Sequence, residues 1–284
     1  MNTSLLQVLV GIFSGFLVAY LAYRARALSL SGFWSAAIVG SITFGLGGIA
    51  WAILLLSFFI SSSLLSIAFK QKKKSLSEKF SKGSRRDWSQ VLANGGVPTL
   101  LALTWFILRE VNVDLADYGW VWLAYAGSLA AASADTWATE LGVLNSRRPL
   151  LITSLKPVDP GTSGGISLTG AISAWVGSLF IAILAVIMSW AGWVESMPQV
   201  INWGQLGVVT LAGLLGSLAD SLLGATLQAI YFCQSCEKET EKHPLHTCGS
   251  ITYLARGLTW LNNDWVNVTC VVVGAVVAGL LSFA

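Results

Sequence analysis

The sequence predicts an all-α, polytopic membrane protein, a helical bundle of about eight transmembrane helices. Of its 284 residues 55% are hydrophobic and only 11% are charged, with a mean hydropathy of +0.69. Soluble domains usually carry about 25% charged residues. The 28 glycines and 13 tryptophans are typical of packed membrane helices and membrane interfaces. These features exclude a disordered chain, a coiled coil and a nucleic-acid-binding arm, and they favour a single integral membrane domain over residues 1–284.

Eight apolar stretches approach the roughly 20 residues that a helix needs to cross a hydrocarbon core about 30 Å thick. We expect membrane helices over residues 5–23, 30–47, 49–68, 91–108, 118–133, 166–190, 204–228 and 266–283. Only a glycine-rich turn (Gly45, Gly47 and Gly48) separates the second stretch from the third. A merged span, and seven spans in all, is therefore the alternative.

The basic residues alternate between the two sides of the predicted bundle. The loops after the first, third, fifth and seventh spans hold 16 of the 17 Lys and Arg residues. Positively charged loops remain on the cytoplasmic side of a membrane. We therefore expect loops 69–90, 134–165 and 229–265 on the cytoplasmic or stromal face and both termini on the opposite, non-cytoplasmic face.

Three acidic residues on that inner side predict a cation site. Asp135 and Glu140 stand at the inner end of the fifth span, and Asp220 lies inside the seventh. A carboxylate within a membrane helix is costly to keep and therefore indicates function. Mg²⁺ is usually held by one or two carboxylates together with substrate phosphates. The alternatives are solvated acids at a helix end and, for Asp220, a buried acid hydrogen-bonded to Ser217 or Ser221.

A glycine- and hydroxyl-rich turn at 160–165 leads into the sixth apolar stretch. Free backbone N–H groups at the start of a helix bind anions, and Lys156 is close enough in sequence to add charge. The turn lacks the Gly-Lys-Ser/Thr ending of a P-loop. In the basic run 70–86, which is typical of contacts to anionic lipid, Arg85 and Arg86 are the candidates for a specific role.

Five candidate metal ligands lie within sixteen residues: Cys233, Cys236, His243, His246 and Cys248. A structural Cys₃His zinc site that uses either histidine is the natural interpretation. A redox-active Cys-x-x-Cys pair and thiols without metal are the alternatives.

Five motifs carry a resemblance to a known family. They are QVLANGG at 90–96, ADTWATE at 134–140, PGTSGG at 160–165, GSLADSLLG at 216–224 and NDWVN at 263–267. In this order they resemble the transmembrane-protein-19-like family of integral membrane proteins, which includes the plant and cyanobacterial phytyl-phosphate kinases. The resemblance covers nearly the whole chain.

The resemblance implies phosphorylation of a prenyl monophosphate, such as phytyl phosphate, to the diphosphate by a nucleoside triphosphate, with CTP favoured over ATP. The product would supply tocopherol or phylloquinone synthesis, in a bacterial cytoplasmic or thylakoid membrane or a plastid envelope. A different CTP-dependent enzyme (a prenol kinase or a cytidylyltransferase) and a membrane transporter are the alternatives. Nucleic acid is not an expected partner.

Phosphoryl transfer requires charge neutralisation and in-line positioning more than covalent chemistry from the protein. On this basis we assign a hypothetical role to each candidate residue. Asp135, Glu140 and Asp220 would hold Mg²⁺. The phosphate-binding candidates are Asn94, Lys156, Gly161, Thr162, Ser163, Gly164, Ser221, Arg85 and Arg86. The remaining polar candidates are Gln90, Thr136, Thr139, Asn263, Asp264 and Asn267.

Overall fold

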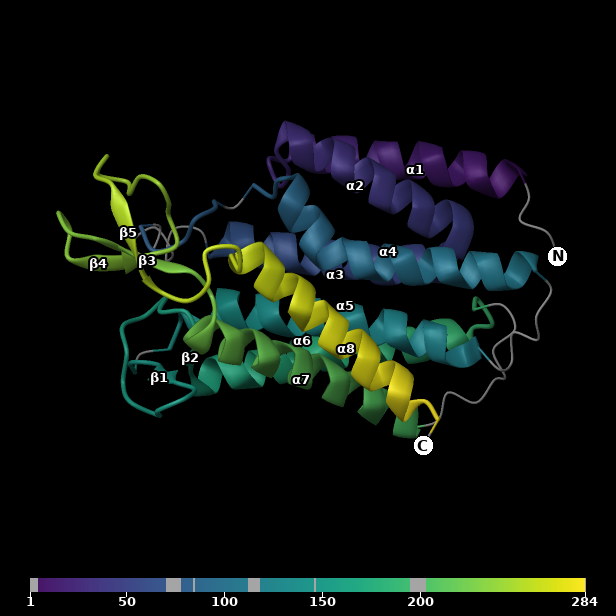
Figure 1. Cartoon of the computed structure of the whole chain (residues 1–284). Helices are drawn as coiled ribbons and strands as arrows, with labels where there is room; N and C mark the ends of the chain where they lie inside the picture. Colours follow the sequence, from purple (N-terminus) through teal and green to yellow (C-terminus); the bar gives the residue numbers. More distant parts are fainter. Residues whose placement is uncertain are drawn as a thin grey trace.

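Long helices pack side by side along most of the molecule (Figure 1). The computed structural model describes residues 5–69, 78–83, 85–111, 118–145, 147–194 and 203–283. These residues form eight α-helices: α1 (Leu5–Arg24), α2 (Leu30–Ile42), α3 (Ile49–Ala68), α4 (Trp88–Glu110), α5 (Gly119–Gly142), α6 (Leu168–Trp190), α7 (Trp203–Thr226) and α8 (Asn263–Leu281). The predicted class of polytopic helical membrane protein is confirmed.

Helices α2 and α3 are separate, so the alternative of one merged span is wrong. A π-helical turn, η1 (Thr43–Gly47), extends α2, and α3 begins directly after Gly48. The backbone of Gly48 has φ +92°, a conformation that residues with a Cβ rarely adopt. The glycine-rich segment that left a merged span possible is therefore the place where the chain turns from α2 into α3.

Helix α5 is the centre of the bundle. Every residue from 121 to 134 is buried, and α5 packs against α3, α4, α6, α7 and α8. A helix that is buried on all sides does not face lipid. This explains why α5, rich in Ala, Gly and Ser, is absent from the seven described helices that are long and apolar enough to cross a membrane by composition.

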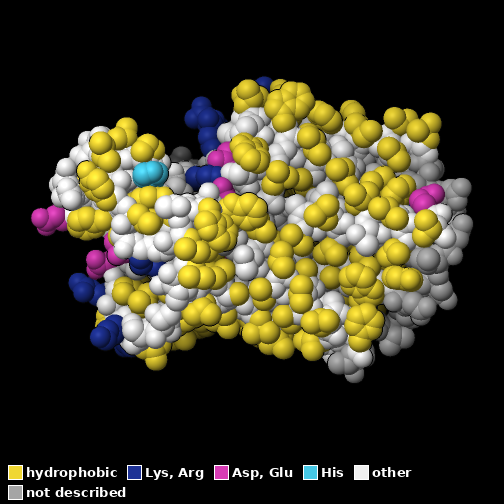
Figure 2. All heavy atoms as spheres, viewed as in Figure 1, with side chains coloured by type: hydrophobic (Ala, Val, Ile, Leu, Met, Phe, Trp, Pro, Cys, Tyr) yellow, Lys and Arg dark blue, Asp and Glu magenta, His cyan; other side chains and the backbone are white. Residues whose placement is uncertain are grey.

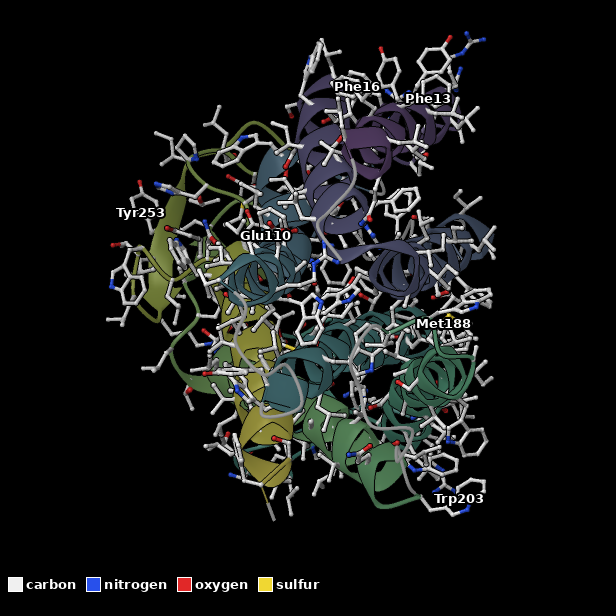
Figure 3. All side chains as sticks on the ribbon, turned by 90° about the vertical axis from the view of Figure 1, so that its right-hand side faces the viewer. Phe13, Phe16, Glu110, Met188, Trp203 and Tyr253 are labelled. Carbon is white, nitrogen blue, oxygen red and sulfur yellow. The ribbon has the colours of Figure 1, made fainter. Side chains whose placement is uncertain are left out.

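The outer surface of the helices is apolar, as contact with lipid requires. Phe13 and Phe16 project from α1 at the edge of the bundle, and Trp203 projects at the start of α7 (Figure 3). The face shown in Figure 2 is hydrophobic over the helices, whereas Lys and Arg side chains gather toward the end that carries the β-strands.

Two small sheets lie at one end of the bundle and depart from the all-α expectation. Strands β1 (Leu150–Leu151) and β2 (Gly165–Ile166) pair, and β3 (Ile230–Cys233) lies between β4 (Lys238–Thr240) and β5 (Thr252–Arg256), all antiparallel. Helix α1 begins and α8 ends at the opposite end of the bundle (Figure 1), so an even number of crossings separates them. Which of the two ends faces the cytoplasm stays a prediction.

The predicted inner loops are shorter than expected, because the helices extend into them. Helix α4 begins at Trp88 with Asp87 as its N-cap, α5 continues to Gly142, and α8 begins at Asn263. The loop bounds 69–90, 134–165 and 229–265 therefore require correction. Residues 70–77 and 84 of the basic run lie outside the described residues.

Candidate functional site

A close crossing of α5 and α7 brings two acids together. A Cβ on Gly216 would lie 2.5 Å from the Cβ of Ala131, so the helices approach more closely than any larger residue allows. One turn further along each helix, the carboxyl groups of Asp135 and Asp220 are hydrogen-bonding neighbours. Two carboxylates in this arrangement repel each other unless a proton or a cation lies between them.

Glu241, which follows β4, extends this acidic group from outside the bundle. Its Oε1 accepts a hydrogen bond from Gln228 Nε2 (3.0 Å), and its Oε2 accepts bonds from the backbone N–H (3.2 Å) and hydroxyl (3.3 Å) of Ser81. Burial and the charge of Asp264 raise the pKa of Glu241. The electrostatic influence of Glu241 also reaches Asp220.

Asp264, in the first turn of α8, is the fourth acid. Lys82 contacts both Asp264 and the residues at the start of α4. Lys82 Nζ lies 2.6 Å from Asp264 Oδ2, 3.0 Å from Asp87 Oδ2 and 2.5 Å from Ser89 Oγ. Ser89 also donates to Asp264 Oδ2 (2.8 Å). Although burial raises the pKa of Asp87, hydrogen bonds from Gln90 and Lys82 outweigh it and leave this pKa below its usual value.

Two oxygens in this group are buried without a hydrogen bond among the described residues: Asp220 Oδ2 and Asp264 Oδ1. Buried carboxylate oxygens normally have a partner, and a cation bound between the acids would supply one. We call Asp135, Asp220, Glu241 and Asp264 the acidic cluster. Its oxygen donors match the preference of Mg²⁺.

The glycine-rich turn at 160–165 packs against the C-terminal end of α7. A Cβ on Gly164 would lie 2.4 Å from that of Ala225, and Ser163 Oγ donates to Gln228 Oε1 (2.5 Å). Gln228 thus connects this turn to Glu241 of the acidic cluster. Arg256 supports the contact by donating to the carbonyls of Gly224 (2.8 Å) and Ser163 (3.4 Å).

The sequence predicted that this turn leads straight into a helix, and that prediction is wrong. Strand β2 and the N-cap Ser167, which accepts from Gly170 N, come before α6. Two of its N–H groups bond within the turn: Thr162 donates to the Asp159 carbonyl (3.1 Å) and Gly165 to that of Thr162 (3.0 Å). Lysine charge at the turn comes from Lys79, whose Nζ contacts the Pro160 carbonyl (2.9 Å), whereas Lys156 is exposed in the connection from β1 to β2.

The structure separates Glu140 from the other two predicted magnesium ligands. Glu140 is five residues beyond Asp135 on α5, so the two side chains leave different sides of a helix with 3.6 residues per turn. Glu140 is buried against α3, where its Oε1 accepts from Ser66 Oγ (2.6 Å). Its charge also acts on Arg86.

Arg86 lies at one end of an apolar cavity between α1, α2, α3 and α4. The cavity measures about 100 Å³, and Gln90 and Asn94 of α4 also line it. The guanidinium carbon of Arg86 lies 5.6 and 5.5 Å from the ring centres of Phe58 and Phe59. Burial lowers the pKa of Arg86 to about 10, against the opposing effect of Glu140, and Arg86 therefore stays charged at neutral pH. Arg85 is exposed.

The other predicted polar residues occupy the same end of the bundle without a defined role. Ser221 follows Asp220 on α7, and Thr136 is half-buried on α5, where Thr139 is exposed. Asn263 and Asn267 lie one turn apart, both half-buried, at the start of α8.

Four of the five predicted zinc ligands form a compact group. One donor atom from each of Cys233, Cys236, His246 and Cys248 lies within 4.8 Å of the others. The fifth, His243, instead stacks on the ring of Tyr231, with centroids 4.3 Å apart and planes 11° apart. Hydrogen bonds from Ser250 and His246 lower the pKa of Cys248 to about 5.

Three residues of the site were not singled out from the sequence: Lys82, Glu241 and Arg256. Lys82 and Glu241 lie in segments with several charges, where the local pattern is that of an ordinary solvated loop, and Arg256 is a single charge at the end of β5. No spacing signal marks them, because their burial results from the sheet folding against the ends of α4, α7 and α8.

The chain matches known proteins over nearly its full length. It is 32% identical over 279 residues to Protein PGR of Arabidopsis thaliana, covering 94% of this chain and 93% of the relative. It is 28% identical to membrane protein MJ0933 of Methanocaldococcus jannaschii (99% and 98% covered). It is 26% identical to Protein VTE6, chloroplastic, of Arabidopsis thaliana (89% and 65% covered). No solved structure matches the chain.

The model of one protein family matches residues 13–275. The match includes all five motifs and the acidic cluster, and it confirms the family resemblance that the motifs predicted. The chain therefore belongs to the integral membrane protein family DUF92.

Proposed function

We propose that this protein is a prenyl-phosphate kinase, which transfers the γ-phosphoryl group of a nucleoside triphosphate to a prenyl monophosphate such as phytyl phosphate. The acidic cluster carries the proposal, because Asp135 and Asp220 face each other across α5 and α7, with Glu241 in electrostatic contact with Asp220. Gln228 links Glu241 to the glycine- and hydroxyl-rich turn. The motif resemblance to phytyl-phosphate kinases and the similarity to VTE6 support the same reaction.

The acidic cluster suits a magnesium–nucleotide complex. Asp135 and Asp220 would hold Mg²⁺, with Glu241 and Asp264 as the neighbouring carboxylates. When bound, the ion neutralises charge on the nucleotide phosphates and orients them. Lys82 lies 2.6 Å from Asp264 and adds a positive charge at the edge of the cluster. The hydroxyl of Thr162 is the donor that the glycine-rich turn offers to phosphate oxygens, because Ser163 Oγ already donates to Gln228.

The cavity between α1 and α4 suits the acceptor. Its lining is mostly apolar, with Ser14, Arg86, Gln90 and Asn94 as the polar members. This arrangement suits the phosphate end of a prenyl phosphate and the first carbons of its chain. Arginine is well suited to phosphate recognition. Contacts from Asp87, next to Arg86, through Lys82 to Asp264 connect this cavity with the acidic cluster.

The reaction needs no general base. An oxygen of the acceptor monophosphate, which is already ionised, forms a bond to the γ-phosphorus. At the same time the bond between the γ-phosphorus and the β,γ-bridging oxygen breaks. A prenyl diphosphate and a nucleoside diphosphate are the products. CTP is our preferred donor and a tocopherol or phylloquinone pathway our preferred context, both from the family resemblance.

The test is phosphate transfer by the purified full-length protein in detergent. Phytyl and geranylgeranyl monophosphates, and the corresponding alcohols, are each incubated with CTP or ATP, with and without Mg²⁺, and products are identified by mass spectrometry. We expect a prenyl diphosphate that depends on Mg²⁺. Product from the alcohols alone would replace our proposal with a prenol kinase. No product from protein that is folded by size-exclusion chromatography would refute a kinase.

A further inference from the structure

The group formed by Cys233, Cys236, His246 and Cys248 has the shape of a metal site. Cys233 Sγ and Cys248 Sγ are 3.6 Å apart, and His246 Nδ1 is 3.3 Å from Cys248 Sγ. All four cysteines of the described chain, these three included, are free thiols. The separation of the two sulfurs far exceeds the roughly 2.05 Å of a disulfide bond.

These distances fit tetrahedral zinc. Zn–S bonds of about 2.3 Å and Zn–N bonds of about 2.0–2.1 Å place neighbouring sulfurs about 3.8 Å apart, and nitrogen and sulfur about 3.6 Å apart, in a regular tetrahedron. The observed separations are within about 0.3 Å of both values. Three thiolates and one imidazole are also an established structural zinc set.

Two turns of the small sheet supply the ligands in pairs. Cys233 ends β3 and Cys236 lies in the turn to β4, which is closed by Glu237 at φ +52°. His246 and Cys248 lie between β4 and β5 in a turn closed by Gly249 at φ +85°, with Gly249 N donating to the His246 carbonyl (2.9 Å). The backbone thus presents both pairs to one point.

We propose that Cys233, Cys236, His246 and Cys248 bind one Zn²⁺ as a closed structural site. All four tetrahedral positions are filled by protein, which leaves none for a substrate. The ion links the end of β3 to the segment between β4 and β5. Glu241 lies between Cys236 and His246, so this link holds the chain that delivers Glu241 to Gln228. The zinc site does not depend on the reaction proposed above.

The structure also selects between the two histidines. His246 is buried in the ligand group. His243 stacks on Tyr231, and its Nδ1 lies 3.4 Å from Thr252 Oγ1. The two histidines therefore form a matched pair of positions for a test, and the buried Cys270 of α8, outside the group, is the matched cysteine.

The experiment measures the metal content of the full-length protein in detergent, purified without chelator, by inductively coupled plasma mass spectrometry. We expect about one zinc per chain, independent of any activity. Cys233→Ser, Cys248→Ser and His246→Ala should lose the zinc, whereas His243→Ala and Cys270→Ala should keep it. Cobalt added to zinc-depleted protein should produce the visible absorption of a tetrahedral thiolate site.

The unsubstituted protein decides the question even where a variant fails to fold. Folded protein without zinc that also binds no added Zn²⁺ overturns the proposal, as does bound iron with the absorption of an iron–sulfur cluster. A Cys233–Cys248 disulfide found by mass spectrometry overturns it in favour of a redox pair. Loss of zinc from His243→Ala, with retention in His246→Ala, overturns the ligand set.

Discussion

The two halves of the helical bundle differ in how closely their helices pack. Helices α1 to α4 surround an apolar cavity with Arg86 at one end. Helices α5, α7 and α8 leave no such space at their crossings: a Cβ on Gly127 would lie 2.5 Å from the carbonyl oxygen of Gly274, and one on Gly216 would lie 2.5 Å from the Cβ of Ala131.

Under the proposed function, this difference would let one membrane bundle bind two unlike ligands. A lipid chain requires space between helices, whereas a magnesium–nucleotide site requires carboxylates from different helices held close together. Glycines at helix crossings meet the second requirement, because they let the backbones approach and bring Asp135 to Asp220. On this view α1–α4 bind the prenyl acceptor and α5–α8 bind the donor, and each half can be disrupted alone.

The largest effect is expected at the acidic cluster. Asp220→Asn removes one of the two facing charges on α5 and α7, and we expect the rate of phosphate transfer to fall by about 10²–10³-fold, the cost of losing one preorganised charge-stabilising group. Steady-state formation of prenyl diphosphate measures it. Glu140→Gln is the control, since Glu140 contacts Ser66 instead, and it should keep the Mg²⁺ dependence of the unchanged protein. Equal losses in both variants would restore Glu140 to the magnesium site.

The crossing itself is the next target. Gly216→Val inserts side-chain atoms where none fit, and overpacking of this kind costs about 1–3 kcal/mol. We expect a lower Tm in detergent and a loss of activity as Asp220 moves away from Asp135. Gly207→Val on the same helix is the control, because a Cβ there meets nothing within 4 Å. A full rate with Gly216→Val would show that the close approach of α5 and α7 is dispensable.

Arg86 tests the other half of the comparison. A hydrogen bond to a charged group contributes about 1.5–3 kcal/mol, so Arg86→Met should raise the KM for prenyl phosphate by about 10- to 100-fold. The KM for the nucleotide should change little. Arg85→Met is the matched control, because Arg85 is exposed. A rise in the KM for the nucleotide alone would mean that Arg86 binds the phosphoryl donor instead of the acceptor.

The smallest effect is a pH dependence of stability at Glu241. Because its pKa is raised above the ordinary value of 4.5 in the folded protein, the stability that this group contributes is present below pH 4.5 and is lost as pH rises through the folded pKa. In metal-free buffer the Tm of the unchanged protein should therefore fall, relative to that of Glu241→Gln, as pH rises from the ordinary pKa of Glu to the raised pKa of folded Glu241. The exposed Glu239→Gln serves as the comparison and should show no such trend. A Tm difference that stays constant with pH would contradict ionisation of the half-buried Glu241 over this pH range.

Composition and charge alone determined much of the architecture. Apolar stretches of membrane length located the helices, because a segment that crosses lipid must be apolar along its whole length. The five motifs led to the family. The acids Asp135 and Asp220 also stood out locally, since an acid in an apolar run is conspicuous without knowledge of its neighbours.

Tertiary structure alone decided which of the predicted residues meet. Sequence spacing placed Asp135, Glu140 and Asp220 in one group, but the rotation of α5 against α3 and α7 directs Glu140 away from the other two. Glu241 became a site residue only when the segment after β4 met Ser81 and Gln228. Lys82 became one only when the starts of α4 and α8 came together around it. The turn before β5 alone separated His246 from His243. These outcomes depend on helix rotation and on contacts between distant segments, which no local pattern of residues specifies.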